Sequence, residues 1–377
     1  MRAEDNTERT ELFFTTLLQR AGINLNGTNP WDIQVHDERF FKRFLAGGSV
    51  ALGESYMDGW WDVDSLEEFF VRVFKIGAES EAHRPTGLRL RTLFFRIFNT
   101  QAGRRAFHVG KRHYDAGNDL FERMLDSQMA YSCGYWKDAE DLDSAQEAKL
   151  DMICRKLGLQ PGMRMLDIGC GWGSLLKFAA EKYGIEGLGV TVSGEQVKLA
   201  NQRIAGLPIE VRLQDYRKLT GSFDAIASVG MAEHVGWKNY AKYMEVAHRC
   251  LKPGGLFVTQ TIGSTRSIKE TDPWISKYIF PNSMLPSLAQ LSRAAEPYFV
   301  VEDVQNFGAD YDRTLMAWDE NFRSAWPELK EKYGERFYRM WRYYLMSCAA
   351  SFRTRRIQLW QLVLARQPGP ERYDAPR

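Results

Sequence analysis

Apolar residues in the first part of the chain recur at helical spacing. They form two sets, each on one helical face: Leu12, Phe13, Leu17 and Leu18, followed by Phe40, Phe41, Phe44 and Leu45. Gly47-Gly48 and Asp58-Gly59 are typical of turns. The pattern therefore predicts a mainly helical region from about Thr10 to Gly77.

The following stretch, Arg84–Arg112, carries eight basic residues and no acidic one. Within it one helical face is apolar: Leu90, Leu93, Phe94, Ile97 and Phe98. A basic helix with an apolar stripe can lie in a membrane interface, where anionic head groups attract each cation by about 1 kcal/mol. Packing of the stripe against the protein explains the pattern equally well. A nucleic-acid face is disfavoured because no recognisable reading motif accompanies the charge.

From about Lys111 onwards, short apolar runs of strand character alternate with segments of helical period. The strands are predicted at Arg164–Ile168, Gly187–Val192, Ile209–Gln214, Ala225–Val229, Leu256–Ile262, Phe299–Val304 and Gln358–Leu364. This alternation is typical of a doubly wound α/β sheet with right-handed crossovers. Such a sheet binds its ligand at the carboxyl ends of the strands, where we expect the site.

Composition and charge narrow the classes of function. The formal net charge is +2 over 377 residues, so the molecule as a whole is not a binder of polyanions such as nucleic acids. The five cysteines are widely spaced without a C-x-x-C pair, so neither a disulfide framework nor a metal site is expected. The polar start and the lack of an apolar run of roughly 18 residues predict a cytoplasmic protein that does not span a membrane.

The segment Leu166–Gly173 (LDIGCGWG) carries the clearest chemical signal. It follows a predicted strand and opens a helix, and Gly169, Gly171 and Gly173 allow a tight turn and a close approach to a ligand. The pattern differs from the G-x-G-x-x-G of dinucleotide sites, and Asp167 precedes the loop inside the strand. By itself the loop indicates only a nucleotide-like ligand.

The ends of the next two predicted strands refine that ligand. The second strand ends in Thr191-Val192-Ser193, without the acidic residue that usually holds a dinucleotide ribose, and Gln196 follows one helical turn later. The Gln196 amide could bind ribose hydroxyls instead. The third strand ends in Gln214-Asp215-Tyr216, where the acid could accept a hydrogen bond from an adenine amino group. Together these features predict an adenosine site of the methyltransferase kind.

The chain resembles bacterial cyclopropane-fatty-acyl-phospholipid synthases and the related mycolic acid cyclopropane synthases. The matching segments span residues from about 50 to 361, in order: GESYMDGWW, HYDAGNDLF, YSCGYW, LDIGCGWG, VTVSGEQ, LQDYR, SVGMAEHVG, DPWISKYIFP, FGADYDRTLMAW and FRTRRIQLWQ. LDIGCGWG identifies only a methyltransferase, whereas the aromatic N-terminal segment, YSCGYW and DYDRTLMAW are specific to this family.

The resemblance implies a class I methyltransferase domain with a seven-stranded sheet at 111–377, a small helical domain at 1–83 and a basic amphipathic linker at 84–110, commonly in a homodimer. It implies S-adenosylmethionine as cosubstrate, with Tyr131 and Ser132 joining the glycine loop and strand ends around it. The implied reaction transfers the methyl group to a cis double bond of an unsaturated phospholipid acyl chain. Loss of a proton from the added methyl then closes a cyclopropane ring. The implied location is peripheral, on the inner membrane surface.

In the family, the base that removes this proton is thought to be a bound bicarbonate ion. The matching positions imply four contacts to it: the backbone amide of Cys133 together with Glu233, Ile262 and Tyr311. A carboxylate beside an anion raises the proton affinity of that anion, so Glu233 would both orient the bicarbonate and strengthen it as a base.

Gln260 and Cys348 are two further candidate positions for the chemistry. The family's bicarbonate-binding histidine is replaced here by Gln260, which keeps an amide donor but can neither carry charge nor shuttle a proton. Anion affinity or proton removal could therefore differ. Cys348 matches a cysteine once favoured as the family's active-site residue, although its helical surroundings favour a place in the core.

Three other functions remain open. The first is methylation of the same acyl chains without ring closure, as the change at Gln260 suggests. The second is methylation of a small amine, which related folds support. The third is a non-catalytic protein that binds lipid surfaces through a decayed cofactor site, against which the intact glycines, Gln196 and Glu233 argue.

Overall fold

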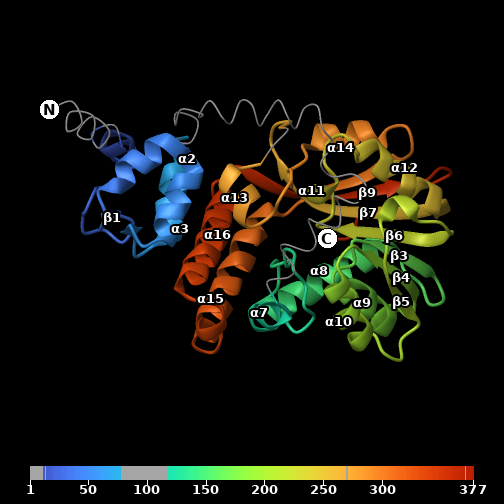
Figure 1. Cartoon of the computed structure of the whole chain (residues 1–377). Coiled ribbons are helices and arrows are strands. Elements are labelled where there is room, and N and C mark those ends of the chain that lie inside the picture. The colour runs from blue at the N-terminus through green and yellow to red at the C-terminus, as the bar shows by residue number, and fades with distance from the viewer. Residues whose placement is uncertain (1–11, 13, 78–116, 269–270, 370) are drawn as a thin grey trace. The chain divides into compact units, whose positions relative to one another are not determined.

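The computed structural model describes residues 12, 14–77, 117–268, 271–369 and 371–377. It divides into two compact units (Figure 1): the first comprises Met1–Phe98, Asp272–Ile279 and Leu315–Arg356, and the second Asn99–Thr271, Phe280–Thr314 and Ile357–Arg377. The predicted basic helix within Arg84–Arg112 lies outside the described residues. Within the described ranges, no helix is both long and apolar enough to cross a bilayer.

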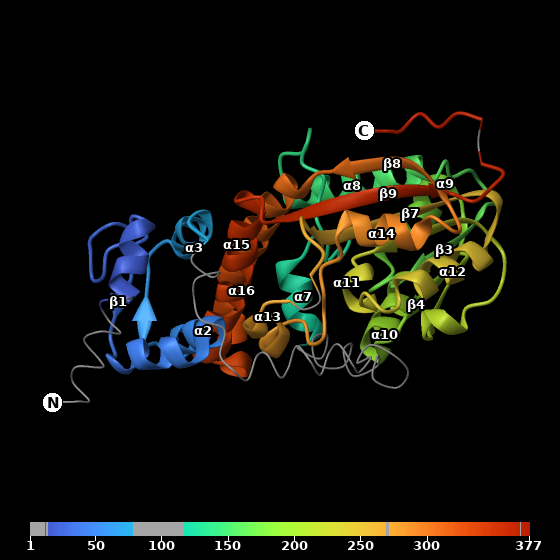
Figure 2. The ribbon, with the colours of Figure 1, turned by 90° about the horizontal axis from the view of Figure 1, so that it is seen from above.

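The second unit is built on a seven-stranded sheet. Its strands are β3 (Arg164–Ile168), β4 (Glu186–Thr191), β5 (Ile209–Leu213), β6 (Phe223–Val229), β7 (Leu251–Ser264), β8 (Val300–Asn306) and β9 (Ile357–Ala365). Their order is β5-β4-β3-β6-β7-β9-β8. The five strands β3 to β7 run parallel to one another. Strand β9 runs antiparallel to both of its neighbours, β7 and β8, and Figure 2 shows β8 beside β9. The predicted doubly wound sheet and its seven strands are confirmed.

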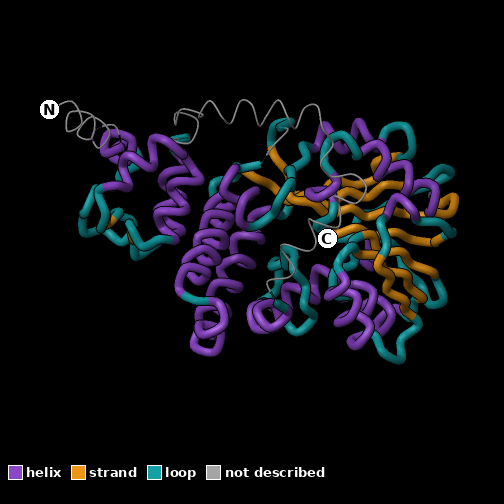
Figure 3. The backbone as a smooth tube through the Cα atoms, in the orientation of Figure 1, coloured by secondary structure: helices purple, strands orange, loops and turns teal. Residues whose placement is uncertain are grey.

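Helices cover both faces of this sheet. One face carries α8 (Leu142–Lys156), α9 (Ser174–Tyr183) and α10 (Gly194–Arg203), and the other carries α11 (Ala232–Val235), α12 (Tyr240–Cys250) and α14 (Leu288–Ala295). In Figure 3 the strands accordingly lie between two groups of helices. Each face has its own buried apolar cluster, so the central strands β3 and β6 are buried on both sides. The short helix α7 (Asn118–Met124) and η1 (Tyr216–Lys218) complete the layers.

The first unit is mainly helical, as its apolar spacing predicts. It contains α2 (Arg39–Met57), α3 (Leu66–Lys75), α13 (Pro273–Tyr278), α16 (Glu335–Arg353) and the part of α15 (Gly308–Tyr333) that follows Thr314. A short antiparallel pair, β1 (Gln34–Val35) with β2 (Trp61–Asp62), was not predicted. The expected turn at Gly47-Gly48 is instead a kink inside α2, where Gly48 has φ 55° and ψ −131°.

Aromatic packing holds the first unit together. Phe14 lies edge-on to Phe40 with ring centroids 5.0 Å apart, and Tyr56 packs on Trp61 at 4.9 Å. Helix α16 packs against α3 and α2. The Arg339 side chain on α16 donates to the Asp62 carboxylate at 2.6 Å, so the short strand pair is also tied to this helix.

The Gly263→Ala change should destabilise the sheet of the second unit. A Cβ at Gly263 in β7 would lie 2.0 Å from the indole of Trp360, a buried residue on the neighbouring strand β9. Overpacking of this kind costs roughly 1–3 kcal/mol, which we expect as a lower midpoint of thermal unfolding. The matched control is Gly194→Ala at the start of α10, where no atom lies within 4 Å of the added Cβ. Equal midpoints for the two variants would show that the indole can move aside.

Candidate active site

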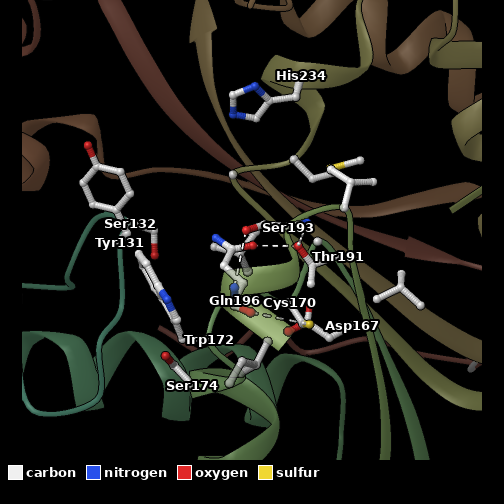
Figure 4. Close-up of a pocket in the computed structure, with 18 of the residues that line it drawn as sticks. Tyr131, Ser132, Asp167, Cys170, Trp172, Ser174, Thr191, Ser193, Gln196 and His234 are labelled. Carbon is white, nitrogen blue, oxygen red and sulfur yellow. Dashed lines mark hydrogen bonds between the residues drawn. The ribbon is translucent and has the colours of Figure 1, made fainter. Parts of the chain in front are cut away.

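A pocket opens at the carboxyl ends of β3, β4, β5 and β6, where a doubly wound sheet binds its ligand. Nine of the ten residues predicted to bind the cofactor line it: Tyr131, Ser132, Asp167, Gly169, Gly171, Thr191, Gln196, Gln214 and Asp215. Figure 4 labels five of them, Tyr131, Ser132, Asp167, Thr191 and Gln196. The tenth, Gly173, lies outside the lining and starts α9 with φ 80°. The structure therefore brings together predicted residues from the ends of three strands, β3, β4 and β5, and from the segment before α8.

The glycine loop is anchored to the neighbouring strand. The backbone N–H groups of Gly169 and Cys170 both donate to the Val190 carbonyl of β4, at 2.9 and 3.1 Å. Gly169 and Gly171 have φ values of 86° and 54°, a region that glycine adopts without strain. Cys170 packs on β4, where a Cβ at Gly189 would lie 2.7 Å from its sulfur. The loop thus presents backbone to the pocket and keeps this thiol buried.

The end of β4 carries a network of buried polar groups. The Thr191 hydroxyl donates to the Gln196 side-chain oxygen at 2.6 Å, and Ser193 caps α10 by accepting from the Gln196 backbone N–H at 3.3 Å. These bonds fix the Gln196 side chain against the pocket wall (Figure 4). Because its oxygen is occupied, the Gln196 amide group faces a ligand as a hydrogen-bond donor.

The end of β5 carries an ionised acid. Asp215 accepts from the Arg217 backbone N–H at 3.0 Å and from the Arg217 guanidinium at 2.9 Å. Burial raises the pKa of Asp215, but these bonds outweigh it and hold the pKa below its usual value. The carboxylate can therefore accept a further hydrogen bond from a ligand amino group.

The geometry around Glu233 follows from the lengths of two strands. Strand β6 ends at Val229, opposite Gln260, whereas β7 continues to Ser264. The chain then enters α11, and one carboxylate oxygen of Glu233 accepts the backbone N–H of Ile262 in β7 at 2.6 Å. The other oxygen, Oε2, is buried and finds no hydrogen-bond partner within the described part of the chain. Burial raises the pKa of Glu233 to about 7 against the opposing effect of its hydrogen bonds.

Gln260 lies on the same strand, two residues before Ile262, and is 1% exposed. Its side-chain oxygen accepts from the Gln361 amide of β9 at 3.0 Å, and its carbonyl accepts from the Gly230 N–H at 2.9 Å. The glutamine is thus held in place by β9 and by the turn that leads to Glu233.

Cys133 and Tyr311 belong to the second unit but do not line the pocket. The buried Cys133 thiol donates to the Gly134 carbonyl at 3.1 Å and lies 3.9 Å from the Thr314 hydroxyl on α15. Thr314 also accepts from the Gly134 N–H at 3.1 Å and from the Trp136 indole at 2.9 Å. Tyr311 lies one turn earlier on the same helix and is buried. Burial raises the pKa of the Cys133 thiol well above its usual value, so this thiol is neutral at physiological pH.

Cys348 belongs to the first unit and not to the second, which contains the other five candidate catalytic residues. It lies on α16, and burial raises the pKa of its thiol to about 12. Its thiol is therefore as unreactive toward an electrophile as that of Cys133, since the thiolate is the nucleophilic form.

Several pocket-lining residues escaped sequence reasoning, among them the titratable side chains of His234 and Lys149. His234, next to Glu233, lines the pocket as a neutral imidazole because burial lowers its pKa to about 4. Lys149 reaches the pocket from α8 and is only 2% exposed. A usable signal for Lys149 existed, since a lysine stands within the apolar stripe of α8 beside Leu150 and Ile153.

Comparisons with known proteins cover most of the chain. A family model described as mycolic acid cyclopropane synthetase matches residues 101–362. The chain is 57% identical over 350 residues to the cyclopropane-fatty-acyl-phospholipid synthase of Escherichia coli strain K12, covering 93% of this chain and 92% of that protein. It is 33% identical over 352 residues to the tuberculostearic acid methyltransferase UfaA1 of Mycobacterium tuberculosis, covering 87% and 82%.

A solved structure has the same architecture. Mycolic acid cyclopropane synthase CmaA1, complexed with SAH and CTAB, superposes with a TM-score of 0.64 at 31% identity. The match covers 68% of this chain and 97% of that one. It is therefore similar to most of this chain in both sequence and fold.

The Glu233→Gln change should alter how stability depends on pH. The folded carboxyl holds its proton up to pH about 7, whereas an ordinary glutamate releases it near 4.5. Unfolding between these values releases a proton, so the stability of the native protein falls as pH rises through this window. The variant has no such proton, so its free energy of unfolding does not fall in this way. The free energy of unfolding of the variant minus that of the native protein should therefore rise by about 3 kcal/mol across this window and level off above pH 7. Denaturant titrations of both proteins at several pH values across this window measure this difference in free energy of unfolding. A difference that stays constant with pH would contradict the prediction.

Proposed function

The chain belongs to the mycolic acid cyclopropane synthetase family, and on that premise we propose that it is a cyclopropane-fatty-acyl-phospholipid synthase. Such an enzyme methylates a cis double bond of an unsaturated phospholipid acyl chain and removes a proton from the added methyl, so that a three-membered ring closes. The observation that carries the proposal is the 57% identity with the Escherichia coli enzyme, which extends over 93% of this chain.

We assign S-adenosylmethionine to the pocket at the strand ends. When bound, it supplies an electrophilic methyl group. The residues present fit this ligand, because the glycine loop leaves room for close approach and the Gln196 amide offers a donor to the ribose. The Asp215 carboxylate offers an acceptor to the adenine amino group. At the other end of the ligand, Asp167 has a buried oxygen without a partner among the described residues.

We assign the base to a bicarbonate ion held by Glu233, Ile262, the Cys133 amide and Tyr311. The fit rests on Glu233, whose Oε2 is buried and unpartnered within the residues described, so that it can accept the hydroxyl of a bound hydrogen carbonate. The hydrogen bond from the Ile262 N–H holds the carboxylate in one orientation. With a pKa of about 7, Glu233 can also hold or release a proton near neutral pH.

A covalent route through a cysteine thiol is disfavoured by the burial of both candidate cysteines. The thiols of Cys133 and Cys348 are held neutral by burial, and methyl transfer to an alkene requires no enzyme nucleophile. The chain's own contribution is therefore to bind, to orient and to exclude water around a reacting centre that becomes positively charged.

A second candidate function is methylation of the acyl chain without ring closure. Two observations favour it: Gln260 stands where the family has histidine, and the 33% identical Mycobacterium tuberculosis relative is named a methyltransferase. Ring closure requires that the proton leave the added methyl. If a 1,2-hydride shift first moves the positive charge to the methylated carbon, loss of a proton from the methyl leaves a methylene branch instead. A saturated methyl branch would require, in addition, a separate hydride donor such as a reduced nicotinamide or flavin cofactor.

The proposed substrate resides in a membrane, so we propose that the protein acts peripherally on the inner membrane surface. We also propose that it acts as a homodimer, as the family resemblance implies. The basic segment Arg84–Arg112 is the part of the chain expected to meet anionic head groups. The proposal requires that binding to anionic vesicles weaken with increasing salt.

An assay with labelled S-adenosylmethionine and vesicles of cis-unsaturated phospholipid tests the proposal directly. We expect label in the acyl chains and, by mass spectrometry, a ring at the position of the former double bond. Vesicles of saturated phospholipid are the control, because they lack the π bond that accepts the methyl group. A methyl-branched or methylene product would contradict ring formation and support the second candidate function. The absence of any labelled lipid would overturn both candidate functions.

Position 260 can be tested with two variants. The Gln260→His change should preserve or improve cyclopropanation, because an imidazole nitrogen can still accept the Gln361 amide and can also bind an anion. The matched control, Gln260→Met, removes the hydrogen bonds at similar length and should lower kcat by roughly tenfold, about the effect of one lost hydrogen bond. A large loss in the histidine variant would mean that this position has been rebuilt around glutamine.

A further inference from the structure

Two polar side chains of α8 are buried and reach the segment that forms one wall of the pocket. Gln146 donates to the backbone carbonyls of Ser132 and Ala130, at 2.7 and 3.2 Å. Lys149, one turn later, donates from its ammonium group to the Ser132 hydroxyl oxygen at 2.8 Å. The first contact fixes the backbone of the wall, and the second fixes a side chain that faces the pocket (Figure 4).

The charged groups that face Lys149 come from two other elements. Asp126 precedes α8 and Asp167 lies in β3, and both carboxyl groups are buried. Asp126 already accepts the backbone N–H groups of Gln128 and Ala130, at 2.8 and 2.9 Å. Asp167, by contrast, lines the pocket with one oxygen, Oδ1, that has no partner among the described residues. Of the two acids, Asp167 is thus the one with an oxygen left for a ligand.

The contact with Lys149 determines what Ser132 can offer. An ammonium group can only donate, so the Ser132 oxygen is the acceptor in this bond. The single hydroxyl hydrogen of Ser132 therefore remains available to donate elsewhere. A nearby positive charge polarises that hydrogen and strengthens its bond to an anionic acceptor. This end of the pocket presents a polarised donor at Ser132 and an open acceptor at Asp167.

We propose that Lys149 is a positioning residue that acts through Ser132 to select ligands carrying a carboxylate in their tail. This inference rests on the proposed function, because S-adenosylmethionine has an α-amino acid tail with one carboxylate and one ammonium group. The carboxylate is the group that the Ser132 hydroxyl would bind, and the ammonium group matches the open oxygen of Asp167. Lys149 is thus assigned to recognition of the cosubstrate and not only to the core of α8.

The same helix provides a matched control. Lys156 is also fully buried, and it donates to Gln305 at 2.7 Å and to Asp303 at 3.1 Å. Both partners belong to β8, and Lys156 does not line the pocket. Lys156→Met therefore removes a buried lysine from α8 without touching the ligand site.

Calorimetry with two ligands distinguishes recognition of the carboxylate tail by Lys149 from a purely structural role of this lysine. S-adenosylhomocysteine and 5′-methylthioadenosine share the adenosine thioether, but only the first has the amino acid tail. In the full-length protein, Lys149→Met should weaken binding of S-adenosylhomocysteine by about tenfold or more, as expected for one charge-assisted hydrogen bond. Binding of 5′-methylthioadenosine should change by less than about threefold. Lys156→Met should leave the ratio of the two affinities as in the native protein.

A double-variant comparison tests whether Lys149 works through Ser132. Ser132→Ala should also lose affinity for S-adenosylhomocysteine, and adding Lys149→Met to it should cause little further loss. Additive losses, or an equal loss for both ligands, would overturn the proposal. If Lys149→Met does not fold, Lys149→Gln and Ser132→Ala are judged by the same ratio of affinities. Native protein that binds neither ligand would overturn the proposed function itself, a result distinct from failure of the Lys149 assignment.

Discussion

The early end of β6 is the constraint on which the arrangement of the site depends. Its neighbour β7 runs on to Ser264, and a buried backbone N–H without an acceptor costs about 1–3 kcal/mol. The Glu233 carboxylate supplies the missing acceptor at Ile262. One interaction therefore completes the edge of the sheet and places an acid next to pocket-lining His234. A shorter β7 or a longer β6 would remove the need for that acid and the space it occupies.

Three buried acids of the second unit, Asp303, Asp167 and Glu233, are of two kinds. The first is paired with a lysine and has a structural role, whereas the other two have a raised pKa and keep an oxygen without a partner among the described residues. Lys156 is matched by Asp303, and the pKa of Asp303 lies below its usual value, as expected for a paired acid. Burial instead raises the pKa of Asp167 and of Glu233 to about 7, and each keeps one oxygen without a partner in the described structure. Such groups lower the stability of the native protein. Asp167 lines the pocket and Glu233 is the neighbour of the pocket-lining His234, and buried acids with raised pKa values are typical of sites that bind or move ions.

The fold could be predicted largely from the sequence because central strands buried on both faces appear as apolar runs between glycines. The main error in the strands concerns β7, which begins at Leu251 and not at Leu256, because Pro253-Gly254-Gly255 has the composition of a turn but lies within the strand. Pocket residues at strand ends could also be predicted, since a strand end is a local feature. The apolar stripe of α8 could indicate that Lys149 is buried, but its contact with Ser132 could not be predicted, because the two residues lie 17 positions apart in the chain and meet only in the tertiary structure.

In the proposed mechanism, the glutamine at position 260 changes which group can handle the proton. Its side-chain oxygen is occupied by the Gln361 amide, and an amide neither gains nor loses a proton near neutral pH. The Cys133 thiol is likewise held neutral by burial. Glu233 differs from both, because burial brings its pKa to about 7. A histidine beside such a glutamate would be a second group titrating in the same range. In the proposed mechanism, its replacement by glutamine therefore removes one proton carrier and leaves Glu233 in place, so that ring closure does not depend on a histidine at position 260.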